Sequence, residues 1–227
     1  MPGLEEKKQI LAALPKGAYI FDNDGVLAES EGKWFEAYVR LLAPYHVVHN
    51  LLVHRQMMGQ SDRACILMLQ AIHPELPQGP DATEELLMQR GLLIQAVKTE
   101  SPIRPMPGAV EFVQAAIKQN IPTAMATGTS RVDIDDQIKL LGWASLFKTV
   151  VAGDEIEHSK PAPDIYLEAA RRLGVKPEDC VVFEDSLSGL TSAKTAGMKT
   201  VFVRDARFQL SAPFEPSLTI ASFTELL

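Results

Sequence analysis

Short apolar stretches alternate with amphipathic stretches along most of the chain. Runs of β-prone apolar residues predict strands at 18–22, 121–126, 149–152, 180–184 and 199–203. Apolar positions spaced three and four residues apart predict helices at about 108–119, 131–141, 163–173 and 187–196. Strands that alternate with helices in this way form a parallel sheet with helices on both faces. We therefore expect an α/β fold with a Rossmann-like core that binds ligands at the carboxyl ends of its strands.

Residues at the ends of these segments support the assignment. Gly142, Gly174 and Gly197 stand just past three of the predicted helices, where glycine is a common C-cap. The segment 218–220 is expected to add an edge strand. Ser222 and Glu225 have the spacing of a capping box, which predicts a short terminal helix.

The segment between the first strand and Met106 differs from the rest of the chain. Its roughly 80 residues have helical periodicity and almost no strand signal, which is far too long for a simple connection between a strand and a helix. We interpret 29–104 as an inserted α-helical cap domain, and 1–28 together with 105–227 as the core domain.

Three helices are expected in the inserted segment, near 31–43, 61–73 and 83–98. Ser61 is the expected N-cap of the second helix. Asp81 and Glu84 have capping-box spacing at the start of the third.

The composition restricts the partners and the compartment. The 227 residues carry a net charge of −7, which argues against nucleic acid as a partner because phosphate backbones need clustered Lys and Arg. Cys65 and Cys180 are too few for a disulfide framework and fit a reducing compartment. The first ten residues have no signal-peptide core, and no apolar run approaches the ~18 residues of a membrane span. We expect a cytoplasmic protein without a membrane partner.

Acidic residues follow two of the predicted strands. Asp22 and Asp24 end the first strand and can share one of its faces, and Glu184 with Asp185 ends the fourth. Each run alone also fits a strand end where an acid meets water. Carboxylates about 4 Å apart repel each other by roughly 4 kcal/mol at an effective dielectric near 20. A site that gathers all four would therefore need a hard cation such as Mg²⁺.

Two further strands lead into polar segments of a different kind. Thr127 and Gly128 offer a hydroxyl and an amide that suit a phosphate, although this segment also fits an ordinary helix cap. Lys160 precedes Pro161 and Pro163, which stiffen the loop before a predicted helix.

The order Asp-x-Asp-Gly-Val, Thr, Lys-Pro and Glu-Asp resembles that of the haloacid dehalogenase superfamily. The chain is most similar to the branch that contains β-phosphoglucomutase and many small-metabolite phosphatases, over residues 18 to about 204. The resemblance implies that Asp22 attacks phosphorus and that Asp24 acts as general acid and base. It also implies that the cap closes over the site as a lid.

The resemblance further implies a cofactor and a phosphate site. Mg²⁺ would be held by Asp22, the carbonyl of Asp24 and Asp185, with Glu184 close by or as a further ligand. Phosphoryl oxygens would be bound by Thr127, the amide of Gly128 and Lys160.

We expect a magnesium-dependent phosphatase for a small phosphorylated metabolite, a sugar or nucleoside phosphate. One alternative is a β-phosphoglucomutase-like mutase, but Trp34 stands where the mutases carry a histidine, and Glu29 replaces the family's frequent aspartate before Ser30. Another is a non-catalytic binding or regulatory protein, which would not require Asp24. A dehalogenase would lack Asp24. The expected assembly is a monomer or weak homodimer.

Several residues are left with two interpretations. Arg63 and Arg131 are possible substrate contacts, and each also fits a solvated arginine. We expect His46, His49 and His54 to be solvated or buried in the cap, because no cysteine or paired acid accompanies them as a metal ligand.

Overall fold

In the described part of the chain, six parallel strands form one sheet in the order β3-β2-β1-β4-β5-β6. The structure is a computed structural model that describes residues 2–205 and 210–227. The strands are β1 (Ala18–Phe21), β2 (Thr123–Ala126), β3 (Thr149–Val151), β4 (Cys180–Glu184), β5 (Lys199–Val203) and β6 (Leu218–Ile220). The central strand β1 pairs with both β2 and β4, and Ile20 lies opposite Ala124 on one side and Val182 on the other.

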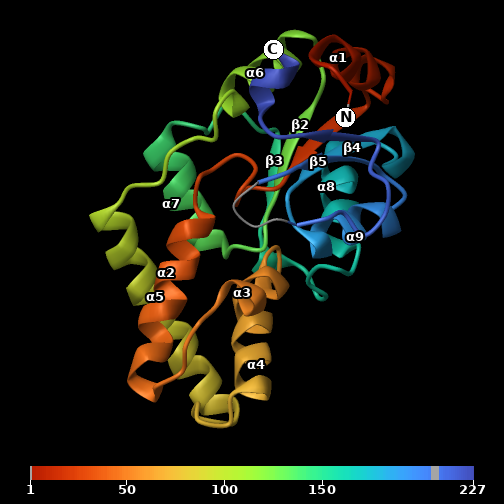
Figure 1. Cartoon of the computed structure of the whole chain (residues 1–227). Coiled ribbons are helices and arrows are strands. Elements are labelled where there is room, and N and C mark those ends of the chain that lie inside the picture. Colours follow the sequence, from red (N-terminus) through yellow and green to blue (C-terminus); the bar gives the residue numbers. More distant parts are fainter. Residues whose placement is uncertain (1, 206–209) are drawn as a thin grey trace.

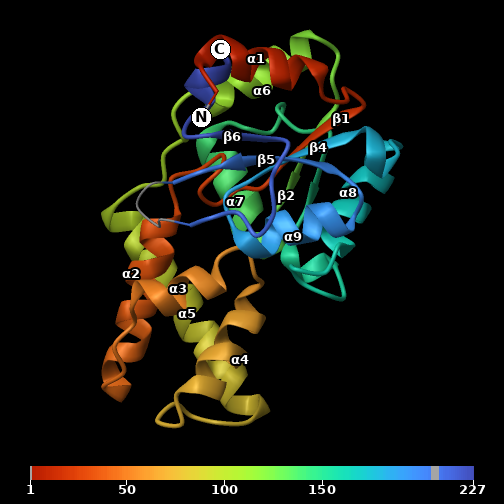
Figure 2. The same ribbon diagram turned by 45° about the vertical axis from the view of Figure 1, so that its right-hand side comes forward.

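Helices cover both faces of this sheet (Figures 1 and 2). They are α1 (Leu4–Ala13), α6 (Ala109–Lys118), α7 (Arg131–Leu141), α8 (Asp164–Leu173) and α9 (Leu187–Thr195). Successive strand residues point to opposite faces. Phe21 therefore packs with Phe112 of α6, whereas Ile20 packs with Tyr166 of α8. The expected α/β class is confirmed.

The predicted strands and helices of the core are present, with ends that shift by a few residues. Gly142 and Gly174 are the C-caps of α7 and α8 in the left-handed conformation, which glycine adopts without strain. Ser222 caps a short 3₁₀ helix (Phe223–Leu226), but Glu225 accepts a hydrogen bond from the amide of Ala221, so the expected capping box does not close. Helix α1 was not predicted, because its charged residues leave little apolar periodicity.

Four of the helices that lie between β1 and β2 in the sequence extend away from the sheet on one side (Figure 1). They are α2 (Glu31–Leu42), α3 (Leu51–Met57), α4 (Asp62–Ile72) and α5 (Pro80–Glu100), and we call them the α2–α5 bundle. The bundle has an apolar cluster of its own, in which Leu41, Leu69 and Leu86 come from three different helices. The segment that enters the bundle and the segment that returns from it lie side by side, because the amide of Glu29 donates to the carbonyl of Arg104 at 2.8 Å.

The starts of the bundle helices differ in part from the sequence prediction. Ser61 caps α4 by accepting from the amide of Ala64, as expected. Helix α5 begins earlier than predicted, with Gly79 as its N-cap and Pro80 as its first residue, so the expected Asp81 box is absent. Helix α3 was not predicted, because its 7 residues are too few to show a helical periodicity. No helix among the described residues has the length and apolarity to cross a bilayer.

Truncating Leu69 tests whether the bundle depends on its own apolar cluster. Leu69 is fully buried between the bundle helices, and Leu67 on the same helix is 51% exposed. Leu69→Ala should lower the free energy of unfolding by about 3 kcal/mol because it leaves a cavity, whereas Leu67→Ala should change it by less than about 0.5 kcal/mol. Urea unfolding measures both, and an equal loss in the two variants would contradict the packing described here.

Candidate functional site

The acidic residues that follow β1 and β4 meet at one edge of the sheet. Asp22 donates its amide to the carbonyl of Phe183 at 3.0 Å, which fixes the end of β1 against the end of β4. Neighbouring parallel strands bring their carboxyl ends to the same edge. As a result Asp22, Glu184 and Asp185 are all buried, and each places a carboxylate oxygen within 4.8 Å of the others.

A buried lysine connects two of these carboxylates. Lys160 donates from Nζ to Asp22 Oδ1 at 2.9 Å and to Glu184 Oε1 at 2.6 Å. Glu184 has further donors, because the Tyr166 hydroxyl also reaches Oε1, and Oε2 accepts from the amide and hydroxyl of Ser186. Both oxygens of Glu184 are therefore held by donors of the protein. Lys160 lies in the loop before α8, as the sequence predicted.

Asp185, the third acid of this cluster, has a carboxylate oxygen without a partner in the described chain. Its Oδ2 is buried without a hydrogen-bond partner in the described residues, which is costly for a carboxylate. Burial, and then the charge of Glu184, raises the pKa of Asp185 well above its usual range. Residue 25 is a glycine that packs closely against this carboxylate, because a Cβ at that position would overlap Asp185 Oδ2. An orphaned oxygen within a group of three carboxylates is the donor set that fits a hard divalent cation.

Asp24 lies beside this cluster and is held by neutral donors. Its Oδ1 accepts from the hydroxyl of Ser30 at 2.5 Å and from the indole Nε1 of Trp34 at 2.6 Å. Its Oδ2 accepts from Thr129 Oγ1 at 2.9 Å and from Thr127 Oγ1 at 3.3 Å. Ser30 and Trp34 belong to the start of the bundle, whereas the two threonines follow β2. The carboxylate is thus fixed between the bundle and the sheet.

The segment after β2 serves two purposes. Ser130 caps α7 by accepting from the amide of Asp133, which is the helix-cap interpretation of this segment. Thr127 and Gly128 precede that cap and face the acidic residues. A Cβ on Gly128 would overlap the carbonyl of Gln60, so only glycine allows this close approach between sheet and bundle.

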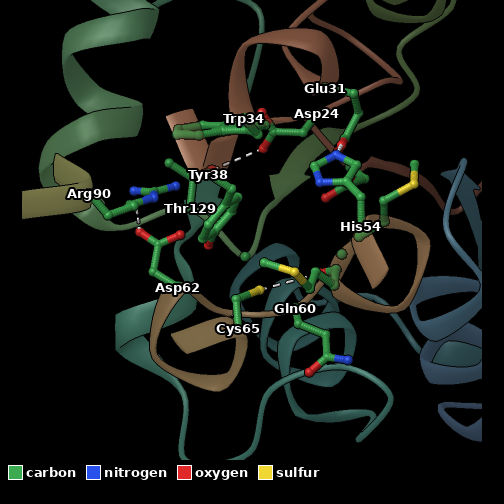
Figure 3. A pocket seen from close by; sticks show the side chains of 15 residues that line it. Asp24, Glu31, Trp34, Tyr38, His54, Gln60, Asp62, Cys65, Arg90 and Thr129 are labelled. Carbon is green, nitrogen blue, oxygen red and sulfur yellow. Dashed lines mark hydrogen bonds and ion pairs between the residues drawn. The ribbon is translucent and has the colours of Figure 1, made fainter. Parts of the chain in front are cut away.

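A narrow pocket separates the acidic edge of the sheet from the α2–α5 bundle (Figure 3). The sheet side contributes Asp22, Asp24, Gly128 and Thr129. The bundle contributes polar, aromatic and apolar groups, which include Glu31, Trp34, Tyr38, His54, Met57, Met58, Gln60, Asp62, Cys65 and Arg90. Trp34, which stands where the mutases carry a histidine, therefore lines the pocket.

Neither of the two arginines considered as possible substrate contacts lines this pocket. Arg63 is exposed and pairs with Glu84, and Arg131 pairs with Glu155 at 2.6 Å on the outside of the core. The arginine in the pocket is Arg90 of α5, which is only 3% exposed. Sequence reasoning missed it, although Arg90 stands between Leu86 and Ile94 on the buried face of its helix, and a cation in that position is unusual.

Three buried groups form a second polar chain beside the pocket. His54 Nε2 contacts Glu31 Oε2 at 3.1 Å, and its Nδ1 contacts Nε2 of His49 at 3.1 Å. Burial, and then the charge of His54, lowers the pKa of His49 to about 4, whereas burial raises the pKa of Glu31. His46 is exposed. His49 and His54 are buried, and none of the three histidines belongs to the carboxylate cluster found among the described residues.

Comparison with known proteins assigns the family. A sequence model for haloacid dehalogenase-like hydrolases matches residues 17–197. The chain belongs to this family. It is 34% identical over 185 residues to the phosphorylated carbohydrates phosphatase of Thermotoga maritima, which covers 82% of this chain and 83% of that protein. It is also 34% identical over 215 residues to a probable pseudouridine-5'-phosphatase of Drosophila melanogaster, with 91% and 89% covered.

A solved structure supports the same assignment. CbbY from Rhodobacter sphaeroides in complex with phosphate superposes with a TM-score of 0.81 at 27% identity, covering 92% of this chain and 96% of that one. The chain is thus a haloacid dehalogenase-like phosphoric monoester hydrolase, and the resemblance inferred from its motifs is confirmed.

His49 should make the fold sensitive to acid. Because its pKa is about 4 when folded and 6.5 ordinarily, its contribution to stability is present above pH 6.5 and is lost as the pH falls toward 4. Between about pH 7 and about pH 4, His49→Gln should lose less free energy of unfolding than the unmodified protein, by on the order of 2 to 3 kcal/mol.

Urea unfolding at the two pH values measures this difference. The matched control is His46→Gln, which replaces an exposed histidine of the same bundle. If both variants followed the pH dependence of the unmodified protein, His49 would not be the acid-sensitive group.

Proposed function

We propose that this hydrolase is a magnesium-dependent phosphatase for a small metabolite, a sugar phosphate or a nucleoside phosphate, and that it acts through an aspartyl-phosphate on Asp22. The observation that carries the proposal is the contrast between two adjacent carboxylates. Asp22 is held by the cation of Lys160, and Asp24 by neutral donors alone. One relative is named for phosphorylated carbohydrates and another for pseudouridine 5'-phosphate, which supports this class of substrate.

Asp22 suits the role of nucleophile. Burial raises its pKa, and the charge of Lys160 opposes this shift and favours the ionised carboxylate. In the first step an oxygen of Asp22 forms a bond to phosphorus while the bond to the leaving oxygen breaks. In the second step water attacks phosphorus, the bond to Asp22 breaks, and phosphate leaves. Thr127, the amide of Gly128 and Lys160 would bind phosphoryl oxygens in both steps.

Asp24 suits the role of acid and base, and its contacts favour one of its two oxygens as the one that would carry the proton. Trp34 Nε1 can only donate, so Oδ1 remains an acceptor. Oδ2 faces the hydroxyls of Thr127 and Thr129, which can donate to a carboxylate or accept from a carboxylic acid. We assign the transferable proton to Oδ2. It passes to the leaving oxygen in the first step and is regained from water in the second.

The carboxylates of Asp22 and Asp185, with the carbonyl of Asp24, would hold the magnesium ion. Glu184 would lie close to the ion, since both of its carboxylate oxygens already accept hydrogen bonds from the protein. The bound ion would supply positive charge that keeps these buried acids ionised and reduces the repulsion between Asp22 and a phosphate.

Hydrolysis is favoured over the mutase alternative by Trp34. The indole occupies the place beside Asp24 and neither gains nor loses a proton near neutral pH. It can orient Asp24, but it cannot share in proton transfer as a histidine could.

We further propose that 29–104 acts as a cap on a core of 1–28 and 105–227, of which residues 1 and 206–209 lie outside the described chain. The pocket beneath the bundle has a volume of about 40 Å³, room for a few water molecules but not for a sugar phosphate. The bundle would therefore have to move for substrate to enter. A cytoplasmic location and a monomeric or weakly dimeric state remain predictions from the sequence.

Magnesium should bind the free protein and stabilise it. At a concentration about 100 times its dissociation constant, the ion should add about 2.7 kcal/mol to the free energy of unfolding. Asp185→Asn should abolish this gain while leaving the metal-free protein at least as stable, because it removes a buried unpaired charge. Thermal melting with and without magnesium measures both effects. Asp136→Asn, on an exposed part of α7, is the control that should keep the full gain.

Phosphate release should depend on both aspartates. Across a panel of phosphorylated sugars, nucleotides and small acids, Asp22→Asn should abolish magnesium-dependent release, and Asp24→Asn should lower it by roughly 10² to 10⁴. Asp136→Asn should release phosphate at the unmodified rate. Conversion of β-glucose 1-phosphate to the 6-phosphate without phosphate release would instead identify a mutase.

A further inference from the structure

An ion pair lies on the bundle side of the pocket, away from the sheet. Arg90 of α5 donates from Nη1 to Asp62 Oδ2 at 2.7 Å, and Asp62 is the first residue of α4. The side chain of Arg90 is 4% exposed and that of Asp62 is 24% exposed. Figure 3 shows the two groups facing each other beside Trp34. Neither residue has a part in the phosphoryl chemistry described above.

The indole ring of Trp34 lies between this pair and Asp24, the proposed acid and base residue. Trp34 donates to Asp24 from its Nε1, and the guanidinium of Arg90 lies over the Trp34 ring at 4.2 Å from its centroid. If the phosphate of a small molecule binds at Asp22 and Asp24, the other end of that molecule would lie near the Arg90–Asp62 pair.

The charge at this end of the pocket is balanced. Of the side chains that line the pocket in the described chain, Arg90 is the sole arginine or lysine. Burial raises the pKa of Asp62, whereas the charge of Arg90, in contact at 2.7 Å, opposes this shift and favours the ionised carboxylate. Asp133 lies 3.9 Å from Arg90 and adds further negative charge. Among the residues that line the pocket, a second phosphate or a carboxylate on the ligand would find no unpaired cation. Lys98, whose Nζ lies 5.0 Å from the centroid of the Trp34 ring, is outside that lining.

The same pair can still form hydrogen bonds. Arg90 Nε is buried without a partner among the described residues, and it is a donor. The carboxylate of Asp62 has lone pairs left for an acceptor role. A hydroxyl group, which both donates and accepts, matches this combination, whereas an anion can satisfy only the donor.

From these contacts, and on the basis of the phosphatase activity proposed above, we infer the substrate class. The pocket selects phosphate monoesters whose other end is uncharged and carries hydroxyls, as in a polyol or a ribose. It discriminates against a second phosphate or a carboxylate, and Asp62 sets this discrimination by neutralising Arg90.

The test compares matched ligands that differ in one charged group. The pairs are fructose 1-phosphate with fructose 1,6-bisphosphate, and glycerol 3-phosphate with 3-phosphoglycerate. The ratio of kcat/KM for phosphate release with magnesium should favour the member with a single charged group by about tenfold or more. Asp62→Asn frees the charge of Arg90 and should shift this ratio toward the more anionic member by about tenfold.

The control removes one negative charge from the bundle outside the pocket. Glu84→Gln breaks the exposed pair with Arg63 and should leave both ratios unchanged. Binding of the same four ligands to Asp22→Asn, measured by titration calorimetry with magnesium, reports the preference without turnover.

The outcomes separate the inference from the phosphatase proposal. Equal or better use of the more anionic ligands by the unmodified protein would overturn the inference and leave the phosphatase intact. A folded Asp62→Asn protein with unchanged ratios would overturn the role of Asp62. Binding with the expected preference but without phosphate release from any ligand would retain the inference and overturn the phosphatase. Absence of binding by all four ligands would overturn the inference.

Discussion

The ammonium group of Lys160 holds the site together. It is fully buried, and burial alone would lower its pKa, yet the charges of Asp22 and Glu184 raise that pKa well above its usual range. The reverse dependence is equally strong, because three carboxylates within 4.8 Å would repel one another without a cation. Since β1 and β4 supply these acids and the loop before α8 supplies the lysine, the ion pairs also fix where three segments of the core meet.

Asp22 and Asp24 are separated by a single residue, yet their carboxylates lie in different electrostatic environments. Asp22 faces charge from Lys160, whereas Asp24 faces hydroxyls and an indole. Two of the groups that hold Asp24, Ser30 and Trp34, come from the bundle, so any movement of the bundle away from the sheet would loosen Asp24 while leaving Asp22 and Lys160 in place. The structure thus links the position of the bundle to Asp24, the proposed acid and base residue, and leaves the contacts between Asp22 and Lys160 independent of it.

The sequence was informative where chemistry follows from local position. Asp22 and Asp185 could be placed because parallel strands end at one edge, and Lys160 because prolines hold its loop. Arg90 was not considered, and the physical reason is that whether a helical arginine points into a pocket depends on how helices pack, which a single segment does not reveal. The spacing from Leu86 to Ile94 contained that signal. The contacts of Glu31 with His54 join residues 23 positions apart, and no local pattern predicts them.

The two sides of the pocket, the sheet edge and the α2–α5 bundle, differ in charge. The sheet side concentrates negative charge that would require a metal and Lys160 to accommodate a phosphate. The bundle side keeps its charge balanced by pairing Arg90 with Asp62. Because the two sides meet at Trp34, which contacts both Asp24 and Arg90, a change of substrate preference could arise in the bundle without disturbing the phosphoryl chemistry. Trp34 itself is the exception, since its indole donates a hydrogen bond to Asp24, the proposed acid and base residue, and its ring packs against the guanidinium of Arg90.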